Sequence, residues 1–237
     1  MLEIPYDSNP ARDLVRNVVS FINYISKETS VELAKVRGSC HAMQTKKGNK
    51  YYDTYLETRY GKGTEIVSSE QWLKLARTIK ETGLLRNILT TALPPTGRAS
   101  ILMDVTSSLE PIFSASKWNE TTKLAIQSFV KKRVGLNRTK EFLHNAEHQN
   151  SFLGLGLPED EVLKTAKELD THDHLKMMVA VCGHNGVCDE TVSKTVNLNH
   201  QATIEHVYDI FIKAYAYGLK NISVYRDGTH LNQPQKL

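Results

Sequence analysis

The sequence predicts an α/β fold in which helices alternate with short parallel strands. Long segments with apolar residues at helical spacing are separated by short β-branched stretches at residues 87–93 and 220–228. No internal repeat or low-complexity linker interrupts the 237 residues. We therefore expect a single domain over residues 1–237.

The first predicted helix covers residues 9–38, as one helix or two in close succession. Asn9 is expected to cap it, Pro10 suits its first turn, and Gly38 ends it. Apolar residues at helical spacing predict its buried face, and these residues are Leu14, Val18, Ile22, Ile25 and Leu33.

The next predicted elements are a loop, a helix and a strand. Residues 43–65 are polar, aromatic and glycine-containing, which predicts an irregular loop. A helix is expected to begin after Ser68 or Ser69 and to end at Gly83. The β-branched residues 87–93 predict a buried strand that ends at a pair of prolines.

The second half of the chain is predicted to be mainly helical. Amphipathic patterns predict helices over residues 119–135, 158–170, 172–183 and 203–218. In the last helix we expect one apolar face and at least partial burial of two tyrosines, and these residues are Val207, Ile210, Phe211, Ala214, Tyr215 and Tyr217. Residues 220–228 predict a strand that ends in an Asp227-Gly228 turn.

The segment after the predicted strand 87–93 has the composition of an anion-binding loop. Pro94 and Pro95 stop any regular element, and Gly97 permits a close backbone approach. Thr96, Arg98 and Ser100 add hydroxyl and guanidinium donors. A rigid connector explains the same residues equally well. The pattern GxxxxGK[ST] is missing, which excludes a Walker-type nucleotide loop.

The three cysteines, Cys40, Cys182 and Cys188, are an odd number without CxxC spacing. They predict reduced thiols in a cytoplasmic protein, not a disulfide framework. Cys182, His184 and Cys188 lie close in sequence, with His172 and His174 upstream, but this spacing matches no common zinc pattern. No metal site is therefore expected. A redox pair or a nucleophile remains open for Cys182 and Cys188, beside burial as small apolar residues.

Charge and hydropathy limit the partners. The formal net charge of +4 without concentrated basic runs favours a phosphorylated small molecule over a nucleic acid. No apolar run approaches the roughly 20 residues that span a bilayer, so no membrane partner is expected.

Five ordered segments resemble the large subunit of ribonucleotide reductase. Residues 94–113, "PPTGRASILMDVTSSLEPIF", are similar to the family pattern P-T-G-x-x-S…S-S-x-(I/L)-E-P-(I/V)-F. The other four segments also resemble family motifs in the family's order, and they are residues 32–40, 82–97, 172–198 and 202–229. The ending "VYRDG" is typical of the adenosylcobalamin-dependent class II enzymes.

This resemblance implies a fold, a reaction and a binding loop. The implied fold is the C-terminal part of a ten-stranded α/β barrel. The implied reaction converts ribonucleoside di- or triphosphates to deoxyribonucleotides for DNA synthesis, with adenosylcobalamin as the cofactor of the assembled enzyme. The family's P-T-G loop binds substrate phosphates, and the matching residues are Thr96, Gly97, Arg98, Ala99 and Ser100. Arg98 and Ala99 stand where many relatives have threonine or isoleucine.

The family's catalytic residues have no counterpart in this sequence. The thiyl-radical cysteine lies in an N-x-C-x-E segment, which the 237 residues do not contain. Cys40, Cys182 and Cys188 match neither that cysteine nor the family's redox cysteines. The resemblance therefore implies one component of a split reductase, inactive alone, whose partner is an N-terminal chain carrying the catalytic cysteines. A non-catalytic nucleotide-binding or regulatory protein is the alternative, and a truncated gene product is a third reading.

Overall fold

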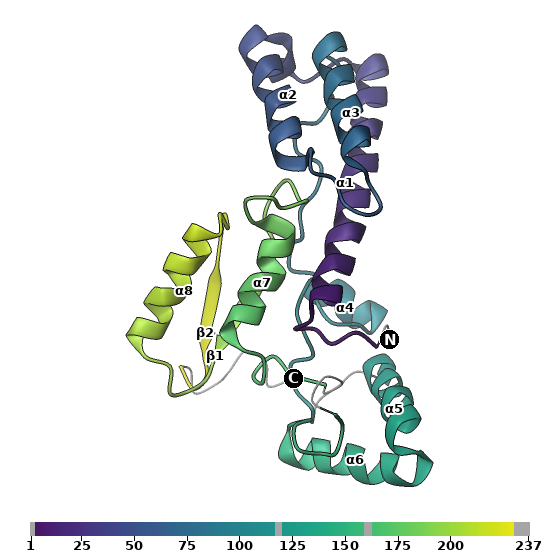
Figure 1. Ribbon diagram of the computed structural model, residues 1–237, viewed down its shortest axis with the longest axis vertical. Coiled ribbons are helices and arrows are strands. Elements are labelled where there is room, and N and C mark those ends of the chain that lie inside the picture. Colours follow the sequence, from purple (N-terminus) through teal and green to yellow (C-terminus); the bar gives the residue numbers. More distant parts are fainter. Residues whose placement is uncertain (1–2, 117–119, 159–162, 230–237) are drawn as a thin grey trace.

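The computed structural model of the protein describes residues 3–116, 120–158 and 163–229. The described chain is mostly helical, with two parallel strands (Figure 1). No described helix is both long and apolar enough to cross a membrane. The helices and strands are α1 (Asn9–Arg37), a 3-10 turn η1 (His41–Gln44), α2 (Lys46–Tyr60), α3 (Ser69–Thr82), α4 (Gly97–Met103), α5 (Glu120–Val134), α6 (Leu136–Gln149), α7 (Thr171–Cys182), β1 (Thr195–Leu198), α8 (Ile204–Ala216) and β2 (Ser223–Arg226).

The buried apolar residues form three clusters along the chain. One lies among α1, α2 and α3 and is centred on Trp72, which stacks on Tyr60 at a centroid distance of 4.6 Å. A second joins α1, α7, α8 and the strands. The third is formed by α5, α6 and the residues around Phe152. Helix α1 runs past α3 at one end and α7 at the other, so it connects the first two clusters (Figure 1).

The predicted parallel strands are present but short. β1 and β2 pair in parallel with Thr195 opposite Ser223 and Leu198 opposite Arg226. The predicted strand 87–93 is reduced to an isolated parallel bridge between Leu93 and Val192. Backbone hydrogen bonds from Leu93 N to Thr191 O (3.1 Å) and from Ser193 N to Leu93 O (2.7 Å) hold this bridge.

Several helix boundaries follow their local signals. α1 is one helix that ends at Gly38, although Ser8 caps it in place of Asn9. α3 begins with a reciprocal capping box between Ser68 and Gln71 and ends at the left-handed Gly83. β2 ends in the predicted turn, with Gly228 at a φ of +78°.

The predicted loop at residues 43–65 is wrong, because most of it forms α2. The Thr45 hydroxyl caps this helix by accepting a hydrogen bond from Gly48 N at 3.0 Å. Tyr52, Leu56 and Tyr60 recur every four residues and bury one face against the Trp72 cluster. Aromatic packing therefore outweighs the low helix propensity of the segment.

The predicted buried face of α1 is also wrong. Val18, Ile22, Ile25 and Leu33 are exposed on the described chain, and Leu14 is half-buried. The buried face instead carries polar as well as apolar residues. Four of the polar side chains bond to other segments, and they are Asn17, Asn23, Lys27 and Ser30.

Other expectations for the second half of the chain also differ from the structure. In the predicted helix 158–170, residues 159–162 lie outside the described residues, and the remainder forms an extended segment and a turn. Tyr215 is 85% exposed, so it lies on the outer face of α8. The same helix buries Ile210 and Ala214 as expected but leaves Phe211 exposed. Helices α4 and α6 form where no helix was predicted.

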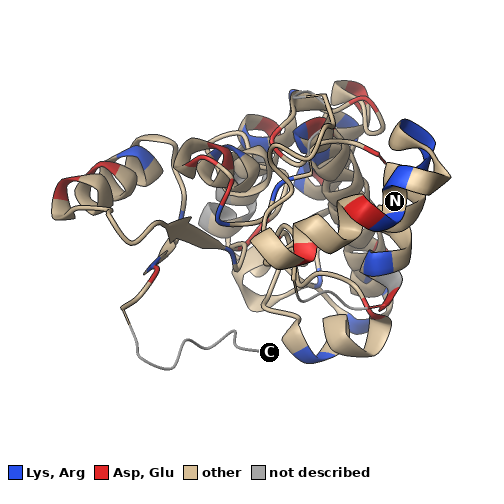
Figure 2. Ribbon diagram, turned by 90° about the horizontal axis from the view of Figure 1, so that it is seen from below, with Lys and Arg blue, Asp and Glu red and all other residues tan. Residues whose placement is uncertain are grey.

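Acidic and basic residues are mixed along the helices, and Figure 2 shows both colours on most of them. This agrees with the small net charge of +4.

Candidate functional site

The predicted phosphate loop follows the Leu93 bridge and leads directly into α4. Thr96 precedes the helix, and Gly97 is its first residue. The first amides of a helix have no carbonyl partner within it, so they can donate to an outside group. A Cβ placed on Gly97 would meet no atom within 4 Å, so the space above this residue is open. Arg98 and Ala99 are exposed beside it.

A second segment, residues 107–108, is hydrogen-bonded to Thr96 at the start of the loop. The Thr96 hydroxyl accepts a hydrogen bond from Ser108 N at 2.9 Å, and Thr96 N donates to Ser107 Oγ at 3.3 Å. Ser100 is buried, and its hydroxyl donates to the Gly97 carbonyl at 2.8 Å. Residues 96–100 and 107–108 therefore form one compact polar unit.

Ser108, beside the loop, has an unusual backbone conformation and an unpaired hydroxyl. Its φ of +47° places it in the left-handed region, which costs energy for a residue with a side chain. Its Oγ is buried and has no hydrogen-bond partner among the described residues. Orphaned buried hydroxyls are uncommon in proteins, and they are satisfied when a ligand or water occupies the site.

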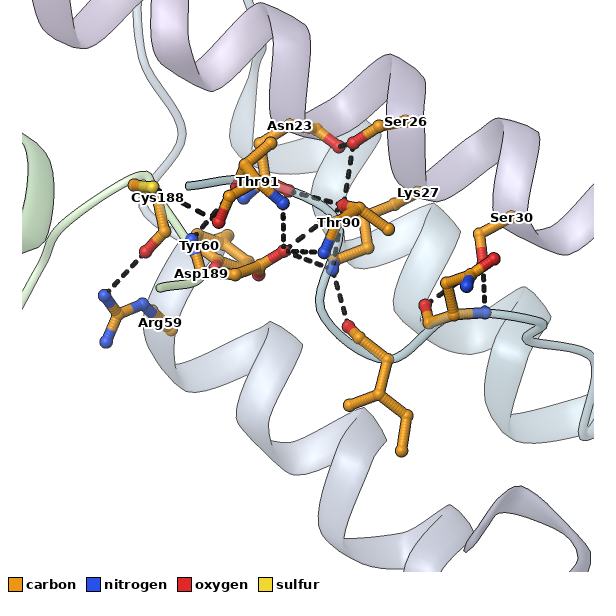
Figure 3. Close-up of polar contacts among 12 residues, drawn as sticks. Asn23, Ser26, Lys27, Ser30, Arg59, Tyr60, Thr90, Thr91, Cys188 and Asp189 are labelled. Carbon is orange, nitrogen blue, oxygen red and sulfur yellow. Dashed lines mark hydrogen bonds and ion pairs between the residues drawn. The ribbon is translucent and has the colours of Figure 1, made fainter. Parts of the chain in front are cut away.

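A buried acid, Asp189, anchors the backbone that enters the loop (Figure 3). Its Oδ2 accepts hydrogen bonds from Lys27 Nζ at 2.6 Å, from Thr90 N at 2.7 Å and from Thr91 N at 3.3 Å. Its Oδ1 accepts from the Tyr60 hydroxyl at 2.6 Å. Four separate segments therefore meet at one carboxylate.

The Lys27–Asp189 ion pair is fully desolvated, since neither side chain is exposed. Burial alone would raise the pKa of Asp189. The charge of Lys27 and the hydrogen bonds from Lys27, Tyr60 and Thr90 outweigh burial and hold that pKa below its ordinary value. Burial lowers the pKa of Lys27, and the charge of Asp189 offsets part of this. Asp189 is therefore ionised and paired.

A second buried network anchors the backbone that leaves the loop. Lys194 Nζ donates to Glu110 Oε2 at 2.9 Å and contacts His174 Nδ1 at 2.8 Å. Thr195 N, at the start of β1, donates to Glu110 Oε1 at 2.7 Å. The Tyr6 hydroxyl donates to the Leu109 carbonyl at 2.6 Å. The loop thus lies between two rigid attachments, one at each end.

This network fixes the tautomer of His174. Because the Lys194 ammonium can only donate, His174 Nδ1 accepts and Nε2 carries the proton, which it gives to the Ala166 carbonyl at 2.9 Å. Burial and the charge of Lys194 lower the pKa of His174 to about 4, against weaker opposing effects of Ala166 and Asp170. His174 is therefore neutral in the folded protein near pH 7.

We expect the protein to lose stability between pH 7 and pH 5 because of His174. The unfolded chain takes up a proton near pH 6.5, whereas the folded chain resists it down to about pH 4. The linked loss of unfolding free energy at pH 5 is about 2 kcal/mol. Urea unfolding at the two pH values measures this loss. His174→Gln should remove it, whereas His172→Gln, on the exposed side of the same helix, should retain it.

The residues considered for zinc point to different partners. His184 Nε2 contacts the Ala216 carbonyl at 3.1 Å, and Cys188 Sγ donates to the Thr91 carbonyl at 3.4 Å. His172 and His174 lie at the opposite end of α7 from Cys182. The described residues contain no group of three or more His, Cys, Asp or Glu side chains suited to a metal ion.

The two anchoring networks were not predicted from sequence. The available signal was a charged residue within a regular helix, as with Lys27, or directly before a strand, as with Lys194. Such a residue is usually solvated, so its sequence position alone does not reveal a buried partner more than 80 residues away.

Comparison with known proteins agrees with this arrangement. Residues 1–225 match the family model described as "Ribonucleotide reductase, barrel domain". A vitamin B12-dependent ribonucleoside-diphosphate reductase of Thermoplasma acidophilum is 28% identical over 95% of this chain and 26% of its own length. A vitamin B12-dependent ribonucleotide reductase of Streptantibioticus cattleyicolor is 28% identical over 97% of this chain and 42% of its own length.

A solved structure shares the fold. The alpha subunit of the Actinobacillus ureae class Id ribonucleotide reductase aligns with a TM-score of 0.64 and 20% identity, over 95% of this chain and 36% of that subunit. The chain thus spans less than half of the length of each of these three proteins. With its parallel strands, its P-T-G segment and a family match over nearly its whole length, the chain belongs to the ribonucleotide reductase barrel-domain family.

Proposed function

We propose that this chain is the C-terminal component of a split ribonucleotide reductase that converts ribonucleoside di- or triphosphates to deoxyribonucleotides. It contributes the substrate-phosphate loop, Thr96–Ser100, while an N-terminal partner chain contributes the radical and redox cysteines. Family membership supports the reaction, and the geometry of the loop supports the division of roles.

In this proposal the loop holds the substrate's phosphates and does no bond-breaking chemistry. The amides of Gly97, Arg98 and Ala99 and the Arg98 guanidinium donate to phosphate oxygens. Because both ends of the loop are anchored in buried networks, the bound phosphate has a fixed position. The ribose is then held against the reactive residues of the partner, which lowers the entropic barrier of the reaction.

The main support for a partner chain is the apolar outer face of α1. Phe21, Ile22, Ile25 and Leu33 line an apolar groove of about 420 Å³ that also touches Asn87 and Thr90. Ile22 is 53% exposed although it belongs to the most apolar stripe of the helix. A helix with apolar residues on its outer face and bonded polar residues on its inner face requires a second covering surface. In this proposal the covering surface is the part of the barrel that the partner chain provides.

Adenosylcobalamin is proposed only for the assembled enzyme, where it supplies the radical. We therefore assign no reaction step of this cofactor to residues of this chain.

The test is nucleotide reduction by this chain, by the candidate partner and by their mixture, each with and without adenosylcobalamin. Activity in the mixture alone, and only with the cofactor, is the expected result. An inactive mixture beside a fully active partner would overturn the proposal and favour the alternative, a nucleotide-binding or regulatory protein of the reductase fold.

Ile22→Asp should abolish co-purification with the partner chain, because it places a charge in the centre of the apolar groove. Val36→Asp is the matched control, since Val36 lies on the same helix, is 84% exposed and does not line the groove. Size-exclusion chromatography of each mixture measures assembly. Equal assembly of the two variants would contradict the proposal that the partner chain binds in the groove.

A further inference from the structure

Two cysteines that the proposed reaction does not use meet at the end of α7. Cys182 is the last residue of that helix. A tight turn follows, closed by a hydrogen bond from Gly186 N to Gly183 O at 2.8 Å. The chain then folds back, so that Cys188 N donates to Val181 O at 3.0 Å. This backbone bond places Cys188 beside the last turn of the helix that carries Cys182.

The turn depends on close backbone contact. A Cβ on Gly186 would lie 2.4 Å from Val181 O and 2.7 Å from Cys182 Cα, so only glycine fits there. Both cysteine side chains are buried in one apolar cluster, with Leu175 and Val192 among their neighbours. The fold therefore holds both thiols in the same apolar cluster, on two segments joined by the backbone hydrogen bond from Cys188 N to Val181 O.

The two thiols differ in acidity. The pKa of Cys188 is lowered to about 7, chiefly by the hydrogen bond from the Cys182 thiol and also by the Glu190 backbone, and burial opposes this shift. The pKa of Cys182 is raised by the same contact and by burial. Cys188 is therefore the more acidic thiol of the pair, and Cys182 is the less acidic one.

We propose that Cys182 and Cys188 are a redox-active dithiol that a hydroperoxide converts to an intramolecular disulfide. The Cys188 thiolate attacks the peroxide O–O bond, which breaks to give a sulfenic acid at Cys188 and, after protonation of the leaving oxygen, water or an alcohol. The Cys182 sulfur then attacks the Cys188 sulfur, and the sulfenic oxygen leaves as water. The two thiols lose two electrons and two protons, and the peroxide is reduced.

This site is separate from the phosphate loop. The pair precedes residues 190–193, which run parallel to residues 91–93, whereas the loop follows Leu93. The thiols therefore lie where these segments begin, and the loop lies where they end. The proposal does not depend on the proposed reductase function, and either can fail without the other.

Oxidation at this site would act on the Asp189 network. Cys188 directly precedes Asp189, and its carbonyl accepts a hydrogen bond from Arg59 at 2.8 Å (Figure 3). A disulfide would link this segment covalently to α7 and restrict the movement of Asp189 relative to that helix.

The test treats the folded full-length chain with hydrogen peroxide, then denatures it and alkylates the remaining thiols. Trypsin releases Met177–Lys194, which carries both cysteines, separately from Gly38–Lys46, which carries Cys40. We expect Met177–Lys194 to lose two hydrogens, to take up no alkylating agent and to recover both thiols after dithiothreitol. The rate should rise with pH, as the Cys188 thiol ionises.

Two variants sharpen the result. Cys188→Ser should leave Cys182 fully alkylated, and Cys40→Ser should leave disulfide formation unchanged. The proposal is overturned if both cysteines stay alkylated at a peroxide dose that oxidises Cys40. It is also overturned if Cys188 passes to sulfinic acid while Cys182 remains a thiol.

Discussion

Lys27→Met should lower the free energy of unfolding by about 3–5 kcal/mol, because it leaves the Asp189 carboxylate buried without its counter-ion. Neither side chain of this pair is exposed to solvent. Methionine keeps the length of the lysine stem but cannot donate to Asp189, to the Ile88 carbonyl or to the Thr90 hydroxyl. The loss therefore reflects unpaired polar groups more than lost packing.

Chemical denaturation of the two proteins measures this difference. Lys35→Met is the matched control, since Lys35 lies on the same helix and pairs with Glu32 at 2.7 Å on the exposed surface. Its loss should stay below about 1 kcal/mol. A Lys27→Met loss no larger than that of Lys35→Met would show that the buried pair does not hold these segments together. Failure of Lys27→Met to fold, while Lys35→Met folds, would agree with the expected cost.

Gly97→Val should raise the KM for the nucleotide by about 10- to 100-fold in the assembled enzyme, since two or more charge-assisted hydrogen bonds to phosphate would be blocked. The side chain would stand in the open space above the loop, where the phosphate must approach. Gly97 does not have a positive φ, so valine fits its backbone without strain. Thermal unfolding and assembly with the partner should therefore remain unchanged.

A graded series separates this effect from a general disturbance. Gly97→Ala adds one methyl group and should raise KM less than Gly97→Val. Steady-state kinetics of the mixed chains, with both variants at saturating cofactor, give the two values. An unchanged KM for Gly97→Val would contradict the assignment of residues 96–100 to phosphate binding.

The sequence alone determined the features that depend on neighbouring residues. The limits of α3 follow from the Ser68–Gln71 capping box and from Gly83, and each signal lies within the helix or directly beside it. The family resemblance likewise depends on ordered motifs, such as residues 94–113, and the match over residues 1–225 confirms it. The P-T-G segment predicted a phosphate-binding role for residues 96–100, and this role stays a prediction.

Only the tertiary structure decided which side of α1 is buried. The apolar stripe of α1 predicted the wrong face, because apolar spacing marks a surface that needs covering and does not say which molecule covers it. The opposite face is buried because it packs against α3 and α7, and there Lys27 meets Asp189, which lies 162 positions away in the sequence. Likewise, α2 forms because Tyr60 stacks on Trp72 from another helix. Such pairings join distant parts of the chain, and local patterns carry no information about them.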